Sequence, residues 1–246
     1  MKGKVAMAKR KKIDRHELKR DKFRENLIKI YTAAKENPQK FITYAVVVVA
    51  VVAAIFGYLG YRSKHKKDAQ EKLGLVYIMM SAEQYREAFD TLQSLVNNYG
   101  NTKPAKTATY LLAHFYYAFG YLDSAIALYQ RYLSFEDKDS DLAAASLFGL
   151  GAIYEDKSRY DEAIRYYKQV VDSYPNFFRA DEAMASMARC YELKGDPMTA
   201  LKIYQEFLVR YPESTLTKRV KLFLARLEAN LTPQIESQTL TKKPEG

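Results

Sequence analysis

A pattern of small and aromatic residues recurs between residues 76 and 212 and restricts the fold more than any other feature of the chain. In its complete form, a small residue is followed by an aromatic residue three positions on, a small residue twelve on, an aromatic residue sixteen on and a proline twenty-four on. The first copy keeps mainly Ala88, and the second lacks the proline. The copies are Val76, Met79, Ala88 and Leu92; Ala113, Tyr116, Ala125 and Tyr129; Gly151, Tyr154, Ala163, Tyr167 and Pro175; and Ala188, Tyr191, Ala200, Tyr204 and Pro212.

The spacing of this pattern predicts stacked helical hairpins. The alanines at 88, 125, 163 and 200 lie 37, 38 and 37 residues apart. Small residues allow two antiparallel helices to approach, and aromatic residues fill the space between neighbouring hairpins. We therefore expect an all-α solenoid of about four hairpins over residues 66–230, closed by a capping helix after Pro212, with residues 231–246 as a disordered tail.

Local signals place the helix ends. Ser158 with Asp161 three residues later resembles a capping box, and Asp196 before Pro197 is typical of a helix start. Each Tyr-Pro pair should end a second helix, because the residue before proline is pushed out of the α region.

The small and aromatic positions resemble the tetratricopeptide repeat, although the period exceeds its usual 34 residues and no tryptophan is present. The resemblance implies that the first helix of each hairpin lines a groove that binds proteins, although several of these side chains could instead pack between hairpins. The expected groove residues are Tyr77, Met80, Tyr110, His114, Tyr117, Phe148, Glu155, Arg189 and Glu192. The expected repeat-packing residues are Ala88, Ala113, Ala125, Gly151, Ala163, Ala188, Ala200, Pro175 and Pro212.

A stretch of 21 residues without charge, 41–61, precedes the repeats. As a helix it would be about 31 Å long, close to the roughly 30 Å of a bilayer's hydrocarbon core. A buried core helix or a cleaved signal peptide are the alternatives, but the valine run and the 40-residue basic stretch before it fit them poorly. The sequence therefore predicts a single transmembrane helix.

The charge distribution predicts the orientation of this helix. Residues 1–61 hold 14 Lys and Arg against 5 Asp and Glu, whereas residues 62–246 hold 25 against 24. The basic counts tie close to the helix, but a short basic tail tends to be retained in the cytoplasm. We expect a single-pass protein of the bacterial inner membrane with residues 1–40 in the cytoplasm and the solenoid in the periplasm.

Within the basic tail, Leu18, Phe23, Leu27 and Ala34 recur at helical spacing among lysines and arginines. This pattern predicts a basic amphipathic helix. Two interpretations stay open, in which the helix lies on an anionic leaflet or its charges only enforce the topology. Binding of nucleic acid by the tail is a third.

Nothing in the sequence favours catalysis, a metal or a cofactor. The histidines are His16, His65 and His114, without the spacing of a zinc site, and Cys190 has no histidine nearby. Asp137, Asp139 and Asp141 alternate like the start of a calcium loop, but the glycine and glutamate that such a loop needs are missing. We expect them to form a solvated connection that caps the next helix.

The architecture of a basic tail, one span and envelope-type repeats also resembles ancillary Sec translocon subunits of the YfgM type. That likeness implies a non-enzymatic scaffold whose partners are the Sec translocon, periplasmic chaperones or newly exported envelope proteins. A receptor with its solenoid in the cytosol, in a bacterium or an organelle, is the alternative.

Overall fold

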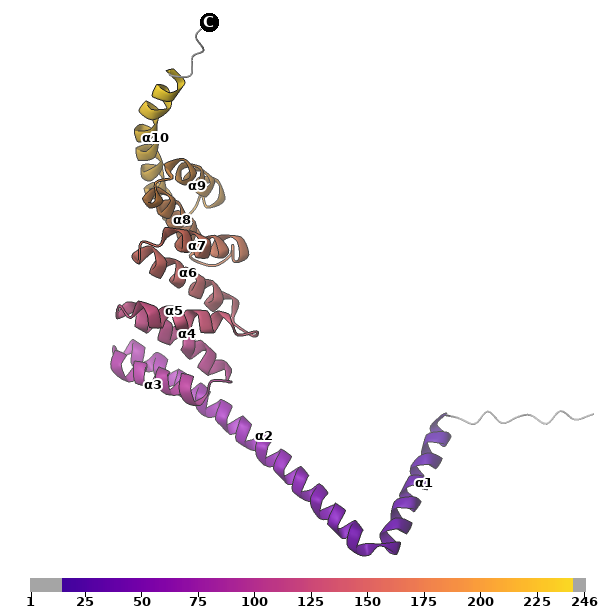
Figure 1. The fold of residues 1–246 in the computed structure, drawn as a ribbon. Helices are drawn as coiled ribbons and strands as arrows, with labels where there is room; N and C mark the ends of the chain where they lie inside the picture. Colours follow the sequence, from indigo (N-terminus) through magenta and orange to yellow (C-terminus); the bar gives the residue numbers. More distant parts are fainter. Residues whose placement is uncertain (1–14, 241–246) are drawn as a thin grey trace, which may run out of the picture. The chain divides into compact units, whose positions relative to one another are not determined.

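A computed structural model describes the backbone of residues 15–240 and the side chains of residues 22–231. This part of the chain contains ten helices and no strand, so the expected all-α fold is confirmed (Figure 1). The helices are α1 (Arg15–Glu36), α2 (Pro38–Ser81), α3 (Tyr85–Asn98), α4 (Lys103–Ala118), α5 (Leu122–Leu133), α6 (Ser140–Asp156), α7 (Tyr160–Ser173), α8 (Ala180–Lys194), α9 (Pro197–Arg210) and α10 (Thr217–Leu240).

The chain divides into two compact units, residues 1–64 and 65–246. The first holds α1 and the apolar part of α2, which begins at Pro38 because proline at the first helical turn loses no hydrogen bond. Helix α2 then continues without a break to Ser81, so the uncharged segment and the first helix of the first repeat are one helix. Among the described residues, α2 is the one helix long and apolar enough to cross a membrane.

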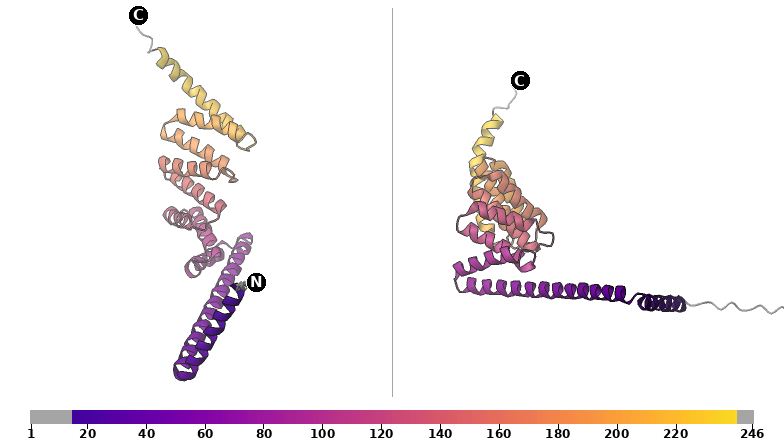
Figure 2. Two further views of the ribbon diagram at one scale, coloured as in Figure 1. Left: turned by 90° about the vertical axis from the view of Figure 1, so that its right-hand side faces the viewer. Right: turned by 60° about the horizontal axis from the view of Figure 1, so that its bottom comes forward.

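The second unit is a stack of helical hairpins in chain order (Figures 1 and 2). Helices α4 and α5, α6 and α7, and α8 and α9 form successive pairs, and the end of α2 packs with α3 and α4 through buried apolar side chains. Helix α10 packs on α9 and buries Val220 and Leu227, as expected for a capping helix.

The repeated small residues lie at the helix contacts. Gly151 has no room for a side chain, because a Cβ atom there would approach the ring of Tyr167 to 2.7 Å. Gly149 faces Tyr129 in the same way, at 2.7 Å. The expected packing alanines are all fully buried, namely Ala88, Ala113, Ala125, Ala163, Ala188 and Ala200.

Two of the expected packing residues have a different role. Pro175 and Pro212 are exposed, so they do not pack between hairpins. Helices α7 and α9 end just before the respective Tyr-Pro pairs, as predicted, so these prolines act through the backbone.

The turn inside each hairpin is the same in all four repeats. The residue seven positions after the small site has a positive φ, with values of 60° at Glu83, 80° at Gly120, 56° at Ser158 and 90° at Gly195. The following amide then donates to a carbonyl five residues back, as Arg159 does to Tyr154 at 2.8 Å. This is the left-handed helix ending that glycine favours.

This turn overturns the predicted capping box at Ser158. Helix α7 begins at Tyr160 with Arg159 at its N-cap, and no side chain caps it. Ser158 instead ends α6 in the left-handed conformation. At the next repeat the expected cap is confirmed, because the carboxylate of Asp196 accepts from the amide of Thr199 at 3.0 Å.

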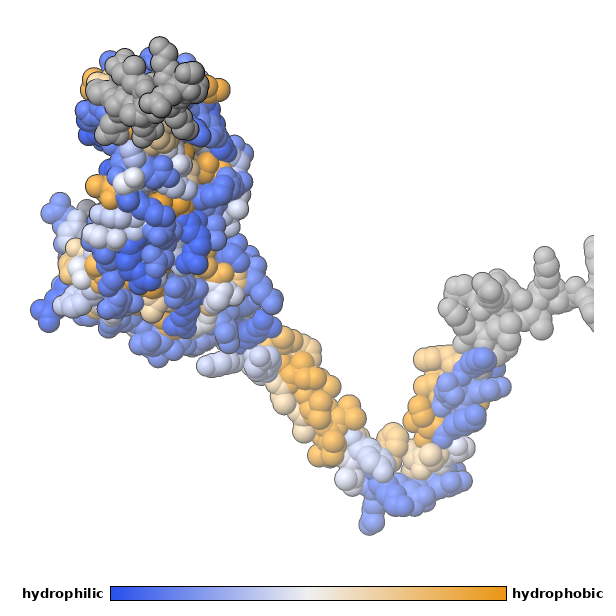
Figure 3. Space-filling model, turned by 45° about the horizontal axis from the view of Figure 1, so that its top comes forward, coloured by the Kyte–Doolittle hydropathy of each residue, from blue (hydrophilic) through white to orange (hydrophobic). Residues whose placement is uncertain are grey.

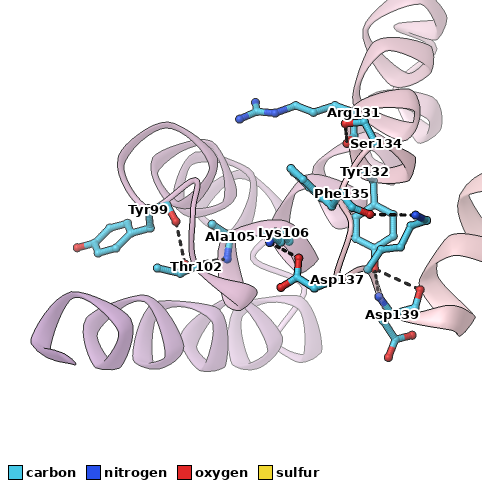
Figure 4. Close-up of polar contacts among 11 residues, drawn as sticks. Tyr99, Thr102, Ala105, Lys106, Arg131, Tyr132, Ser134, Phe135, Asp137 and Asp139 are labelled. Carbon is cyan, nitrogen blue, oxygen red and sulfur yellow. Dashed lines mark hydrogen bonds and ion pairs between the residues drawn. The ribbon is translucent and has the colours of Figure 1, made fainter. Parts of the chain in front are cut away.

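The connection between α5 and α6 is held by side chains rather than by a metal loop (Figure 4). Asp139 caps α6 by accepting from the amides of Asp141 and Leu142 at 2.9 and 3.1 Å. Asp137 pairs with Lys106 of α4. The expected solvated, capping connection is therefore confirmed.

Helix α10 corrects the expected end of the solenoid. The sequence predicted a disordered tail at 231–246, but α10 continues through Pro233 to Leu240. Proline removes one amide donor and crowds the carbonyl four residues back, and the residues that follow Pro233 include no further proline or glycine before position 244. Residues 241–246 lie outside the described part of the chain.

We expect Gly151→Ala to lower the free energy of unfolding by about 1–3 kcal/mol, the usual cost of overpacking a core. Tyr167 cannot swing away, because its ring is buried and its hydroxyl donates to Glu155 at 3.0 Å. Gly74→Ala in α2 is the matched control, since nothing lies within 4 Å of a Cβ there. Urea unfolding of the full chain followed by circular dichroism measures both, and equal stabilities would contradict the packing role.

Ser158→Gly should have the opposite effect and stabilise the chain by about 0.5–1 kcal/mol. Glycine removes the roughly 1–2 kcal/mol cost of the left-handed conformation in the folded state. It also raises the conformational entropy of the unfolded chain, which offsets part of this stabilisation. The same unfolding measurement checks this, with Ser173→Gly at the helical end of α7 as the control that should not stabilise. Two equal responses would show that the turn stores no strain.

Candidate functional site

The first helices of consecutive repeats line a pocket of about 320 Å³. Helices α4, α6 and α8 supply most of its wall, and the connection between α7 and α8 closes one side. Phe178 on this connection is 81% exposed, so an apolar ring stands in solvent at the mouth of the pocket. The position of these helices follows from the repeat, which turns the same face of each first helix towards the same side.

Six of the nine expected groove residues meet in this pocket. They are Tyr110, His114, Tyr117, Phe148, Glu155 and Arg189. Tyr77 and Met80 belong to the first repeat and lie outside it, with Tyr77 half exposed and Met80 partly buried against α3 and α4. Glu192 also lies outside it, about one turn beyond Arg189 on α8.

Tyrosines form the side of the pocket that α4 provides. The Tyr110 ring packs against Tyr129 and Tyr132, with centroids 5.9 and 6.1 Å apart. The Tyr117 hydroxyl donates to Asp156 at 2.8 Å. Burial and this hydrogen bond raise the pKa of Tyr117 to about 12. Tyr117 therefore stays neutral and presents a ring whose polar end is already bonded.

An arginine on the α7–α8 connection completes the pocket. The Arg179 guanidinium lies 3.8 Å from the centroid of the Phe148 ring, a cation–π contact. It also donates two hydrogen bonds to Glu182, at 2.6 and 2.9 Å. Phe148 is only 6% exposed, so it is the floor of the pocket rather than a free contact surface. The sequence pattern did not point to Arg179, because it lies outside the repeated helical positions.

The polar end of the site is a chain of paired groups. Glu155 accepts from the Tyr167 hydroxyl at 3.0 Å and from two nitrogens of Arg189 at 2.6 and 2.9 Å. The bond to Glu155 raises the pKa of Arg189, so the pair stays ionised. The charge of this end is therefore neutralised within the protein.

The same arrangement recurs one repeat later. Glu192 accepts from the Tyr204 hydroxyl at 2.8 Å and pairs with Arg226 of α10. The two glutamates lie 37 residues apart, and so do the two arginines. The sequence predicted Glu155, Arg189 and Glu192 as groove residues and missed these pairs; the recurrence of both residue types after 37 positions indicates equivalent places in the repeat, but not that they bond.

Two residues of chemical interest have ordinary roles. Cys190 is fully buried, and this burial raises the pKa of its thiol to about 12, so it is not a poised nucleophile. His114 lies at the pocket with its ring partly desolvated, which lowers its pKa, and the Arg179 guanidinium lowers it further. A neutral imidazole therefore faces the pocket at physiological pH.

Models of known protein families match the repeats described above. A model of the tetratricopeptide repeat matches residues 105–176, and a second model with the same description matches residues 68–102 and 182–214. The chain is a tetratricopeptide repeat protein. Its hairpins therefore form the scaffold for protein interaction that this repeat provides, and the resemblance deduced from the spacing is confirmed at this level.

Individual relatives of this tetratricopeptide repeat protein are distant. The protein ycf37 of Cyanophora paradoxa is 35% identical over 86 residues, which cover 34% of this chain and 48% of that protein. The chain thus spans about half the length of this curated relative. A tetratricopeptide repeat protein from Parabacteroides merdae has a TM-score of 0.56 at 16% identity, over 66% of this chain and 60% of that one. MamA from Desulfovibrio magneticus has a TM-score of 0.55 at 14% identity, over 71% and 92%. These structures share the fold.

We expect His114 to titrate below the ordinary pKa of 6.5 of histidine, as read from its imidazole NMR signals in the full chain. Arg179→Gln should raise this pKa only part of the way, because burial is the larger cause. Since the folded chain holds His114 neutral, its contribution to stability is present above pH 6.5 and is lost as the pH falls through the lower folded pKa. A pKa at or above 6.5 would contradict the desolvated position.

Proposed function

We propose that this protein is a membrane-anchored scaffold that captures extended segments of other proteins in the groove of its solenoid and carries out no reaction on them. The observation that carries the proposal is the row of Tyr110, His114 and Tyr117 along one face of α4, opening into the pocket beside Arg179. Aromatic side chains offer a large contact area for little loss of conformational entropy, and they are enriched where proteins bind one another.

The pairing of the charged groups defines what the groove favours. Glu155 with Arg189 and Arg179 with Glu182 are already bonded, so a highly charged ligand would have to break these pairs. An apolar or aromatic peptide segment can pack on the rings and leave the pairs intact. Backbone groups of such a segment can still bond to the rim, where Arg179 and Asp156 reach the pocket.

A membrane anchor at residues 41–61 is the second part of the proposal. Each of these 21 residues is exposed, so the described part of the chain does not bury this uncharged helical segment. Figure 3 shows the apolar surface along α2. Such a surface in water would cost roughly 25 cal/mol for each Å² of apolar area, which favours burial in lipid.

The charge bias supports one orientation. The 14 Lys and Arg of residues 1–61 favour retention of the N-terminal tail in the cytoplasm, which puts the solenoid in the periplasm of a bacterial inner membrane. Partners there would be the Sec translocon, periplasmic chaperones or newly exported envelope proteins. This choice of partners rests on the resemblance in architecture to ancillary translocon subunits.

Photocrosslinking in intact cells tests the groove. A photoreactive phenylalanine at position 117 should capture envelope proteins, whereas the same group at position 121 should not capture them. Tyr121 is the matched control, since it is a tyrosine 63% exposed outside the pocket. With a captured partner purified, Tyr117→Ser should weaken its binding about thirtyfold, the loss typical of an interface hot spot.

The outcomes separate the parts of the proposal. Identical adducts from positions 117 and 121 would contradict the groove. Protection of the solenoid from protease added to spheroplasts would contradict the periplasmic orientation and favour a cytosol-facing receptor. Extraction of the chain from membranes by salt or alkali alone would contradict the anchor.

A further inference from the structure

Helix α1 carries a narrow apolar strip that no described part of the chain covers. With 3.6 residues per turn, Phe23, Leu27, Ile30, Tyr31 and Ala34 lie within an arc of about 100°. The four larger side chains are exposed by 67%, 49%, 53% and 70% respectively. The strip runs for about 16 Å along the helix, since each residue advances 1.5 Å. Figure 3 shows the apolar and the charged sides of this helix.

Charges are arranged in order around this strip. Arg24 and Lys35 lie beside it on one edge, about 20° and 40° past Tyr31, whereas Lys22 and Lys29 lie about 80° and 100° beyond its other edge. Glu25 and Glu36 lie on the opposite side of the helix, together with Thr32. Two cations therefore border the apolar strip on one edge, and the acids lie on the far face of the helix near Lys22 and Lys29.

We infer that α1 lies in the plane of an anionic bilayer surface, with the strip buried among the acyl chains and Arg24 and Lys35 at the phosphate headgroups. Lys and Arg side chains are long enough to extend from the edge of such a strip to the headgroups. The inference rests on the proposed anchor, because α1 ends at Glu36 and the uncharged segment begins five residues later.

Other occupants of the strip fit the charges poorly. A second copy of α1 packed antiparallel on the strip would bring Arg24 and Lys35 against the same two cations, where paired helices need opposite charges. A nucleic acid would bind the cations but would leave Phe23, Leu27 and Ile30 in water. If the charges of α1 only set the orientation of the transmembrane helix, neither an apolar strip nor a separation of the acidic residues from it is required.

Tryptophan fluorescence tests the inference, because the chain contains no tryptophan. Phe23→Trp puts a single reporter on the strip, and Thr32→Trp puts the matched control on the opposite side. Each full-length variant is reconstituted in lipid nanodiscs that contain phosphatidylglycerol and phosphatidylcholine or phosphatidylcholine alone. Quenching by brominated acyl chains reports burial in lipid, and quenching by acrylamide reports exposure to water.

In the anionic discs we expect brominated lipid to quench the Trp at position 23 and acrylamide to quench the Trp at position 32. In discs of phosphatidylcholine alone the difference should shrink. Adding Arg24→Gln and Lys35→Gln should lower the ratio of docked to undocked helix about fivefold for each cation removed, since each is worth about 1 kcal/mol near an anionic surface.

Two outcomes overturn the inference and are distinguishable. If the chain elutes with the discs but acrylamide quenches both reporters equally, α1 does not lie on the surface and the anchored scaffold stands. If the chain does not elute with the discs, the anchor itself fails. Equal lipid quenching at position 23 with and without phosphatidylglycerol would overturn the role of the cations.

Discussion

The close contact between a small residue and a flat aromatic ring governs the solenoid. Gly151 and Gly149 leave less than 3 Å between a Cβ position and the rings of Tyr167 and Tyr129, so helices approach at these sites as no larger residue would allow. Ala113 and Ala188 at the positions equivalent to Gly151 are fully buried. Because these small positions lie 37 or 38 residues apart, each first helix presents the same face to the same side, and the α7–α8 connection closes the pocket.

The same periodicity makes the charged part of the groove self-contained. Glu155 reaches forward to Arg189 on the next first helix, and Glu192 reaches forward to Arg226 on α10. Each glutamate also accepts from the tyrosine of its own hairpin. Helix α10 therefore supplies the partner that a further repeat would otherwise provide, as well as covering the end of the core. These pairs stabilise the neighbour contacts on which a repeat protein depends, and they leave the tyrosines of α4 as the part of the groove open to a ligand.

The sequence predicted what depends on periodicity and missed what depends on individual geometry. The offsets from Gly151 located the helices, the buried alanines and the Tyr-Pro helix ends. The predicted capping box at Ser158 was wrong, because the sequence does not distinguish a serine that ends one helix in the left-handed conformation from a serine that caps the next helix. The predicted end of the capping helix near residue 230 was wrong, because the polar residues that follow show no helical spacing of apolar side chains.

The candidate site divides in the same way. Six of the residues predicted from their positions in the repeat line one pocket. The repeat did not indicate that Phe148 forms its floor beneath Arg179, because Arg179 lies on a connection between helices. It also treated Glu155 and Arg189 as separate contact residues. Whether two charged side chains bond to each other depends on the rotation between hairpins, which a single sequence does not contain.

The two units of the chain use different physical forces for their interactions. The solenoid is electrically balanced, and in its pocket Glu155 is paired with Arg189 and Glu182 with Arg179, so binding there depends on short-range contact with rings and should vary little with salt. Residues 1–61 hold 14 of the 39 Lys and Arg residues, and α1 has an exposed apolar strip, so the proposed docking of this part combines long-range attraction with burial in lipid. This separation has a functional consequence for an anchored scaffold. In the proposed anchored scaffold, the basic residues that attract one leaflet lie outside the groove, and so they do not select or repel the protein segments that bind there.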